Sequence, residues 1–284
     1  MMVCFKLLGS LEIKHRGRTC TLTAPKQRQV MALLLLRVGR LVQIGSVIEE
    51  LWGDDPPRSA STTVQTYVYQ LRKTIDREGL APGGQSLLST QPFGYLLQIE
   101  PAQLDVCVFE QHVTEGRRLL DAGQPERASE RLQQALDLWT GPPLADVTQG
   151  RLLSTDAVRL QEQRMRALEL RIQADVQLGR DRDLIGELRS LVARYPLHEW
   201  FHGQLIETLH RAGRRAEAMT AYRQLRALLN EELGLDPSPE LQRLHLRMLA
   251  PGSEPVSSPR WSAGLALRDV GRPAAAVSGT RRGR

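Results

Sequence analysis

The sequence predicts a mainly α-helical protein with a small β part near its N-terminal end. Leu and Ala are abundant while aromatic residues make up only 5% of the 284 residues, and this composition favours helix. Short apolar runs separated by Gly-containing turns occupy the first twenty-odd residues, whereas helical periodicity dominates from about Asp105 onward. The length and the 41% hydrophobic content suit a soluble globular chain of one large domain or two ordinary ones.

The β part is predicted from two apolar runs, Val3 to Leu8 and Leu11 to Lys14, which are separated by Gly9-Ser10. With a second turn at Arg16-Gly17-Arg18, these runs predict a small antiparallel sheet. Pro25 then suits the first turn of a helix, and Lys26 to Val38 has apolar residues at helical spacing.

A second, short helix is predicted from the capping-box pattern Ser46-Val47-Ile48-Glu49, which places its start at Ser46. This helix is expected to end at Gly53, directly after Trp52. An acidic, proline-bearing loop follows at Gly53-Asp54-Asp55-Pro56-Pro57.

The third helix, from Ser59 to Arg77, has two contrasting sides. Its apolar side must face a core and consists of Val64, Val68, Leu71 and Ile75. The opposite side has no acidic residue before Asp76 and carries Thr62, Thr66, Tyr69 and Lys73, with Gln65, Gln70 and Arg72 on its flanks. A helix with one apolar side and one side free of negative charge can enter the major groove of DNA.

A β-hairpin is predicted after this helix, because Leu87 to Leu88 and Tyr95 to Ile99 bracket Gln91-Pro92-Phe93-Gly94. Taken alone, the third helix fits an ordinary surface helix equally well. A sheet, three helices and a hairpin in this order favour a winged helix-turn-helix over residues 1–100.

An all-α repeat domain is predicted for residues 101–249. Three similar helix breaks contain Gly123, Gly179 and Gly213, and the last two are 34 residues apart, which is the tetratricopeptide period. Such helix pairs bury their apolar sides by stacking on their neighbours. Residues 250–284 are rich in Pro, Gly, Ser, Ala and Arg and are expected to form a disordered basic tail.

The net charge of +6 is unevenly distributed along the chain. Residues 1–100 carry +4, residues 101–249 carry −2, and residues 250–284 carry +4. A basic N-terminal part is compatible with binding to nucleic acid.

The predicted DNA contacts fall into two groups. Thr and Gln side chains suit base edges, while Arg and Lys side chains hold phosphates and position the reader. On the third helix these residues are Thr62, Gln65, Thr66, Tyr69, Gln70, Arg72, Lys73 and Arg77. The predicted phosphate contacts elsewhere are Lys26, Arg28, Arg58, Gln91, Phe93 and Gly94.

Several classes of site and location are disfavoured. The chain has no phosphate-binding GxxxxGK[ST] loop, and its three cysteines, Cys4, Cys20 and Cys107, lack the spacing of a zinc site or a disulfide framework. Of the histidines only His198 and His202 have i, i+4 spacing, and they lack the HExxH context, so we expect neither catalytic residues nor a metal or other cofactor. No apolar run reaches the roughly 18 residues of a membrane span, and no signal peptide is evident, so a cytoplasmic protein without a membrane partner is expected.

Ordered landmarks also resemble a known family. Pro25-Lys26-Gln27-Arg28, Leu51-Trp52-Gly53, Val64-Gln65-Thr66-Tyr67-Val68 and Phe93-Gly94-Tyr95-Leu96 are similar to the winged-helix output domain of OmpR-type response regulators. With Leu138-Trp139, Gly141-Pro142-Pro143-Leu144 and Glu231 to Pro237, residues 1 to about 249 resemble the Streptomyces antibiotic regulatory protein family.

The resemblance implies a non-enzymatic, pathway-specific activator of a secondary-metabolite (antibiotic) gene cluster. Family members bind promoter direct repeats near the −35 region and recruit RNA polymerase holoenzyme through its sigma factor and alpha subunit, which implies a homodimer at least on DNA. Their helical half is called the bacterial transcriptional activation domain. The loop Gly53, Asp54, Asp55, Pro56 and Pro57 matches the polymerase-contact loop of such winged helices. Where related wings place an Arg after the Gly-Tyr pair, this chain has Leu96 and Leu97, so backbone contact with phosphate is expected in place of minor-groove reading.

Two alternatives to an activator remain open from the residues alone. One is an interaction scaffold whose winged helix binds protein. The other is a hydrolase in the helical half, which would need a nucleophile–base pair that the sequence does not display.

Overall fold

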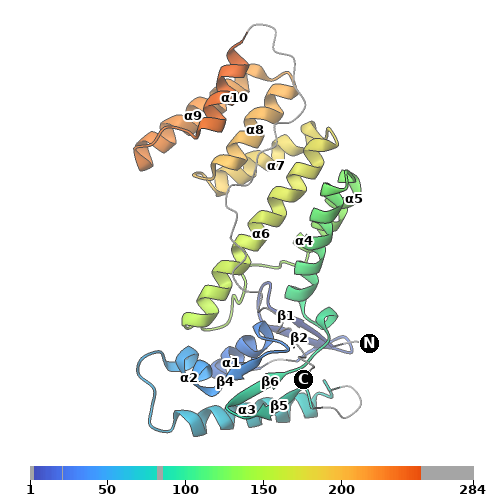
Figure 1. Cartoon of the computed structure of the whole chain (residues 1–284), viewed down its shortest axis with the longest axis vertical. Coiled ribbons are helices and arrows are strands. Elements are labelled where there is room, and N and C mark those ends of the chain that lie inside the picture. Colours follow the sequence, from blue (N-terminus) through green and yellow to red (C-terminus); the bar gives the residue numbers. More distant parts are fainter. Residues whose placement is uncertain (1–2, 21, 82–85, 251–284) are drawn as a thin grey trace, which may run out of the picture.

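The computed structural model describes residues 3–20, 22–81 and 86–250, so the predicted disordered tail lies almost wholly outside the described residues. The chain forms an α+β part and a longer helical part, joined end to end (Figure 1). The α+β part consists of β1 Cys4–Lys6, β2 Glu12–His15, β3 Arg18–Cys20, α1 Pro25–Leu36, β4 Leu41–Gln43, α2 Ile44–Trp52, α3 Ala60–Arg77, β5 Leu88–Gln91 and β6 Gly94–Leu97.

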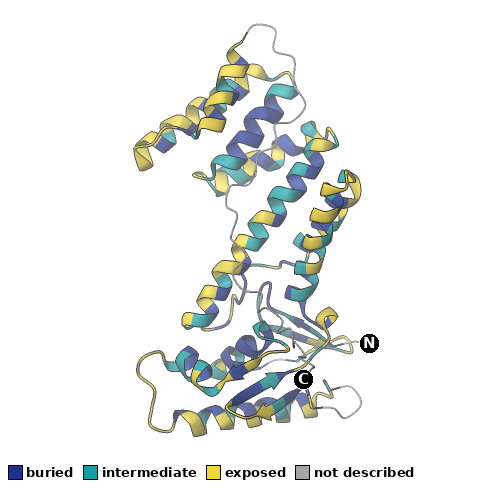
Figure 2. Cartoon of the chain, viewed as in Figure 1, coloured by how far each residue is buried: buried dark blue, intermediate teal, exposed yellow. Residues whose placement is uncertain are grey.

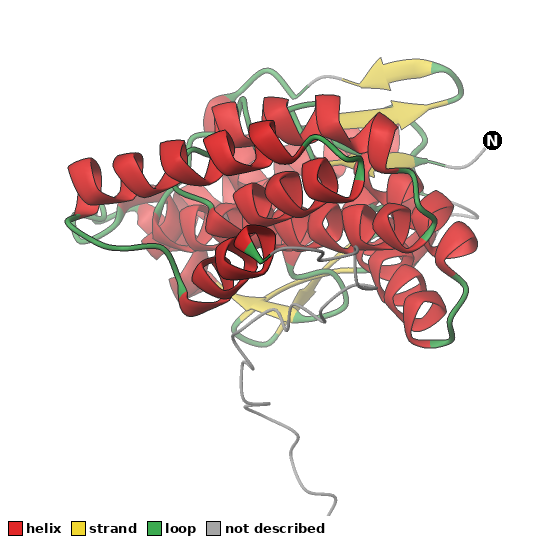
Figure 3. Cartoon of the chain, turned by 90° about the horizontal axis from the view of Figure 1, so that it is seen from above, coloured by secondary structure: helices red, strands yellow, loops and turns green. Residues whose placement is uncertain are grey.

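Two three-stranded antiparallel sheets flank the first three helices, and Figure 3 shows them on opposite sides of the molecule. In the first sheet, with order β1-β2-β3, Phe5 pairs with Ile13 and Ile13 with Cys20, which confirms the predicted N-terminal sheet. The second sheet has the order β4-β6-β5 and contains the predicted hairpin. Its third strand, β4, was not predicted.

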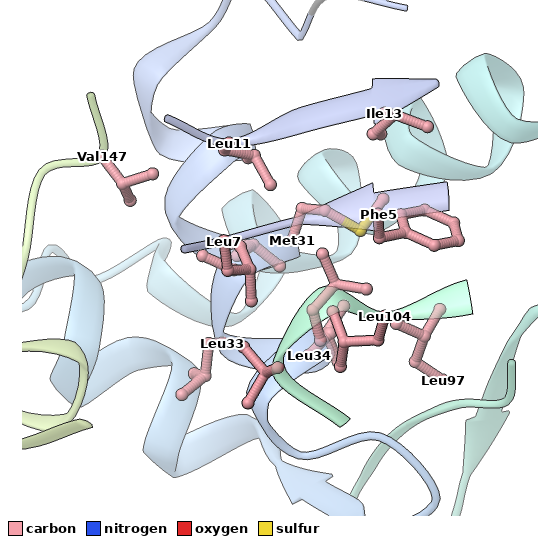
Figure 4. Packing of buried hydrophobic residues seen from close by; sticks show 14 of the residues in the cluster. Phe5, Leu7, Leu11, Ile13, Met31, Leu33, Leu34, Leu97, Leu104 and Val147 are labelled. Carbon is pink, nitrogen blue, oxygen red and sulfur yellow. The ribbon is translucent and has the colours of Figure 1, made fainter. Parts of the chain in front are cut away.

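Apolar side chains from both sheets and α1 meet in one core. Figure 4 shows Phe5 and Ile13 from the first sheet against Met31 of α1, with Leu97 of β6 below them. Helix α1 begins at Pro25, as predicted, and this position suits proline because the first helical N–H has no partner within the helix.

The predicted start of α2 at Ser46 is wrong. The helix begins at Ile44, its N-cap is Gln43, and no side chain caps it. Strand β4 runs directly into the helix, and the Ile44 N–H donates to the Phe93 carbonyl in the β5–β6 turn at 3.0 Å. A tertiary backbone contact therefore replaces the local capping box. The predicted end is confirmed, since Gly53 follows Trp52 with φ of 61°.

The helical part follows a short 3-10 turn at Pro101–Gln103. Its helices are α4 Asp105–Asp121, α5 Pro125–Leu136, α6 Arg151–Gln177, α7 Asp181–Arg194, α8 Glu199–Arg211, α9 Arg215–Leu233 and α10 Pro239–Leu249. All three predicted breaks are confirmed, and Gly123, Gly179 and Gly213 adopt the left-handed conformation with φ of 69° to 76°. Helix α8 is the most deeply buried of these helices, between α7 and α9 (Figure 2).

Helix α6 links the two parts of the chain. Its N-terminal half lies beside the α+β part, and its C-terminal half reaches α7 (Figure 1). The first hydrophobic core continues from the sheets into α4, α5 and α6, while a second core surrounds α8. None of the helices in the described ranges combines the length and apolarity needed to cross a membrane.

Candidate nucleic-acid interface

Helix α3 presents its polar side to solvent at one end of the molecule. The predicted apolar stripe is buried, with Val64, Val68, Leu71 and Ile75 at most 3% exposed. Thr62, Gln65, Thr66, Tyr69 and Lys73 are exposed. Figures 1 and 2 show α3 at the far end from α7–α10, so the helical part does not cover this side. The polar side of α3 is therefore accessible along its length.

Threonines on this side bond to the backbone of their own helix. The Thr66 hydroxyl donates to the Thr62 carbonyl at 3.0 Å, and the Thr63 hydroxyl donates to the Ser59 carbonyl at the same distance. Since the hydroxyl proton of Thr66 is used, this side chain offers outward a methyl group and oxygen lone pairs. Such a surface suits the thymine methyl group or a base-edge donor.

Tyr69 and Lys73 form a pair one helical turn apart. The Lys73 Nζ lies 5.5 Å from the centre of the Tyr69 ring, which is 58% exposed. A cation over an aromatic face is attracted by the ring quadrupole, so Tyr69 restricts where the ammonium group stands. The charge of Lys73 remains available to an anionic partner.

Gln70 is joined to α1 by a contact that the sequence did not predict. The Gln27 side-chain N–H donates to the Gln70 side-chain carbonyl. Because the Gln70 oxygen already accepts this bond, Gln70 does not face the solvent alone. The two amides face it together as one hydrogen-bonded pair. Lys26 and Arg28, the neighbours of Gln27, were predicted to contact phosphate because they are charged, but no contact was predicted for Gln27.

Arg72, which was predicted to contact phosphate, bonds to the hairpin in this structure. Its Nε donates to the Leu88 carbonyl at 2.9 Å, and its Nη2 donates to the Thr90 hydroxyl at 2.7 Å. Arg72 therefore ties α3 to strand β5 of the hairpin and fixes the angle between them. Arg77, at the end of α3, is exposed and pairs with Glu78 at 3.0 Å.

Lys26, Arg28 and Gly94, which were also predicted to contact phosphate, make contacts within the protein. Lys26 donates to the Leu51 carbonyl. Arg28 pairs with Asp146, and only 16% of its side chain is exposed. Gly94 is buried against β4, and a Cβ there would stand 2.2 Å from the Val42 carbonyl oxygen.

The remaining predicted phosphate contacts are all exposed. Arg58 precedes the helix. Gln91 and Phe93 lie at the tip of the β5–β6 hairpin, where Phe93 is 85% exposed and has φ of 70°. A bulky residue with positive φ is uncommon, so the turn holds this ring outward at a cost in backbone energy.

The acidic loop between α2 and α3 is exposed from Gly53 through Ser59. It lies at the same end of the molecule as α3 (Figure 1). Asp54 and Asp55 lie just after the end of α2, where the Asp55 N–H donates to the Trp52 carbonyl at 3.3 Å.

Histidine and cysteine side chains in the described part of the chain are used in packing. His202 bonds to the Pro196 carbonyl at 2.9 Å, and the His198 ring stacks on Phe201 with centroids 4.4 Å apart. Burial lowers the pKa of both imidazoles, which favours their neutral forms. Within the described ranges no three His, Cys, Asp or Glu side chains are grouped as a metal site would require, and the cysteines are free thiols.

Two family models match the chain. Residues 17–97 match "Transcriptional regulatory protein, C terminal", and residues 104–249 match "Bacterial transcriptional activator domain". The two matches meet near the junction between the α+β part and the helical part.

Three relatives align with most of the chain. Regulatory protein DnrI of Streptomyces peucetius is 42% identical over 86% of this chain and 90% of its own length. Transcriptional regulator RedD of Streptomyces coelicolor is 36% identical over 85% of this chain and 68% of its own length. Regulatory protein AfsR of the same species is 37% identical over 86% of this chain, but this match spans only 24% of AfsR.

A solved structure has a similar fold. The structure described as Mycobacterium tuberculosis EmbR in complex with low affinity phosphopeptide superposes with a TM-score of 0.82 at 33% identity. The match covers 87% of this chain and 65% of the EmbR chain.

Proposed function

Because this chain belongs to the Streptomyces antibiotic regulatory protein family of transcriptional activators, we propose that it binds promoter DNA sequence-specifically by inserting α3 into the major groove. Residues 1–100 are then the DNA-binding domain, and residues 101–249 are the activation domain. Proteins of this family are regulators of transcription and not enzymes.

The exposed, acid-free side of α3 is the observation that carries this proposal. Thr62, Gln65 and Thr66 supply base-edge contacts, and Lys73 supplies charge to the phosphate backbone. Gln27 joins this set through its bond to Gln70. Arg58, Arg77 and the hairpin tip at Gln91 and Phe93 add contacts on either side of the groove.

The proposed operator is a pair of direct repeats near the −35 region of promoters in a secondary-metabolite gene cluster. Two copies of the chain in the same orientation, one helical turn apart, would lie on the same side of the duplex. This arrangement makes the active form a homodimer on DNA. It also leaves the acidic loop of each copy beside the DNA, where RNA polymerase holoenzyme would meet it through the sigma factor and the alpha subunit.

The test is footprinting of the purified full chain on the promoters that adjoin its own gene, at physiological salt. We expect two protected stretches of similar sequence in the same orientation, with centres about 10–11 base pairs apart or a multiple of this. Protection should persist in excess non-specific DNA. Protection that disappears under such competition would show non-specific binding and would contradict the proposal.

A further inference from the structure

Exchanged carboxylates reinforce the apolar contact between the DNA-reading part and the helical part. Each part supplies acidic side chains that accept hydrogen bonds from backbone N–H groups of the other part. Glu50 of α2 does so for the start of α6, while Asp105 and Asp146 do so for residues near β1. These partners lie 98 to 135 residues apart in the sequence.

Glu50 caps the N-terminus of α6. Its carboxylate accepts from the N–H groups of Gly150 at 2.6 Å, Leu152 at 2.8 Å and Leu153 at 3.1 Å. The first N–H groups of a helix have no partner within the helix, and a negative charge there also favours the helix dipole. Glu50 is only 2% exposed, and the side-chain N–H of Gln29 in α1 also donates to it. The winged helix thus supplies the cap that α6 lacks in its own sequence.

Gly150 is the matching feature on the helical side. A Cβ at this position would stand 2.2 Å from the Glu50 carbonyl oxygen and 2.8 Å from its Oε1. Its φ of −84° is ordinary for any residue, so the requirement for glycine arises from this close approach alone.

Other polar contacts also join the two parts. The Asp105 carboxylate accepts from the Leu7 and Leu8 N–H groups at 2.8 to 2.9 Å, and Asp146 accepts from the Leu11 N–H at 2.7 Å. Arg37 of the winged helix pairs with the buried Asp156 of α6 at 2.8 Å. Because Asp105 and Asp156 are buried and would be costly to bury without their partners, sliding or rotation of the two parts is unfavourable.

We propose that Glu50 is a positioning residue for transcriptional activation: by capping α6 it locks the acidic loop, the reading helix α3 and the helical part into one rigid body. Helix α2 carries Glu50 and ends directly before the acidic loop. The orientation of α6 is therefore set by the same short helix that presents this loop to the polymerase. The predicted effect on transcription rests on the proposed function. The predicted effect of the cap on α6 itself does not.

The first measurement is hydrogen exchange in the wild-type full chain. The amides of Leu152 and Leu153 should exchange slowly, unlike those of an uncapped helix start. In the Glu50→Gln and Gly150→Ala variants these amides should exchange about tenfold faster, since a hydrogen bond to a charged group is lost or displaced. The matched controls are Glu49→Gln, which removes only an exposed ion pair with Arg151, and Gly141→Ala, where nothing stands near the added Cβ. Both controls should exchange as the wild type does.

The second measurement compares promoter binding with transcription in vitro. In Glu50→Gln and Gly150→Ala, we expect affinity for the promoter to stay within about twofold of wild type, because α3 is untouched, while activated transcription falls at least about fivefold. Rapid exchange of the Leu152 and Leu153 amides in the wild type would overturn the proposal, even where a variant fails to fold. Full activation of transcription by variants whose Leu152 and Leu153 amides exchange rapidly would also overturn the proposal. Failure of the wild type to bind the promoter would instead refute the proposed function and leave the cap intact.

Discussion

Single polar side chains on α3 differ in what they leave free for DNA, because each has different bonds within the protein. The Thr66 hydroxyl proton is used within the helix, the Gln70 oxygen accepts from Gln27, and the Arg72 guanidinium bonds to strand β5. Lys73 differs from these three residues, because its ammonium group lies over the exposed Tyr69 ring. Residue type and helical side were evident from the sequence, but these internal bonds depend on which other element lies within reach.

Asp105 gives the protein a pH-dependent stability. Burial raises the pKa of its carboxyl from 3.8 to about 6, although hydrogen bonds from the Leu8, Leu7 and Val106 N–H groups and the charge of Lys6 oppose the rise. The folded chain therefore binds this proton more tightly than the unfolded chain does. Asp105 stabilises the fold fully below about pH 4, and this contribution is lost as the pH rises through about 6.

We predict that the stability advantage of the wild type over Asp105→Asn shrinks by about 2–3 kcal/mol between pH 4 and pH 7.5. Urea unfolding of both proteins at these two pH values measures the difference. The Asn variant is the proper reference because it does not titrate, and its loss of one acceptor oxygen shifts stability equally at both pH values. A difference that stayed constant with pH would show that Asp105 has an ordinary pKa.

Among the elements, strand β4 decides the shape of the hairpin and was missed in the sequence. It has only three residues, and one of its two apolar side chains, Leu41, is 46% exposed, so no clear strand pattern is visible in the sequence. Its position depends on Gly94, where the backbones of β4 and β6 approach closely.

Gly94→Ala should lower the free energy of unfolding by about 1–3 kcal/mol, since the added methyl group overlaps the Val42 carbonyl. Gly45→Ala in α2 is the control, because nothing stands within 4 Å of its added Cβ. That change should be neutral or stabilise the protein by up to about 1 kcal/mol, as alanine favours helix. Equal losses in the two variants would argue against a close contact between β4 and β6.

The acidic loop can be separated from DNA reading at the same scale. Asp54→Asn and Asp55→Asn change exposed charge and leave α3 unaltered. We expect promoter affinity equal to or slightly above that of the wild type, because a negative charge near DNA is removed, and a severalfold loss of activated transcription. Electrophoretic mobility shifts and single-round transcription on one promoter measure the two quantities. Parallel loss of both would place the loop in DNA binding.

At the scale of the whole molecule, periodicity predicted the order of elements well. The two sides of α3, the hairpin and the three helix breaks all depend on local spacing, which one sequence displays. The contacts that orient the two halves do not depend on local spacing. Arg28 was expected at phosphate and pairs with Asp146, while Glu50 had no expected role and caps α6. Such pairs join residues about a hundred positions apart, and nothing local marks them.

The proposed function depends on α3 reading DNA, and paired substitutions on this helix test such reading most directly. Binding of the full chain to its promoter and to non-specific DNA is measured across a range of salt concentrations. Lys73→Ala should weaken binding to both DNAs by a similar factor and reduce the salt slope by about 0.9. Thr66→Ala should weaken only promoter binding, by about 1–3 kcal/mol. Arg182→Ala, which removes an exposed charge from α7, should change neither. If Lys73→Ala and Thr66→Ala both bind promoter DNA and non-specific DNA as tightly as the wild type does, α3 does not read DNA.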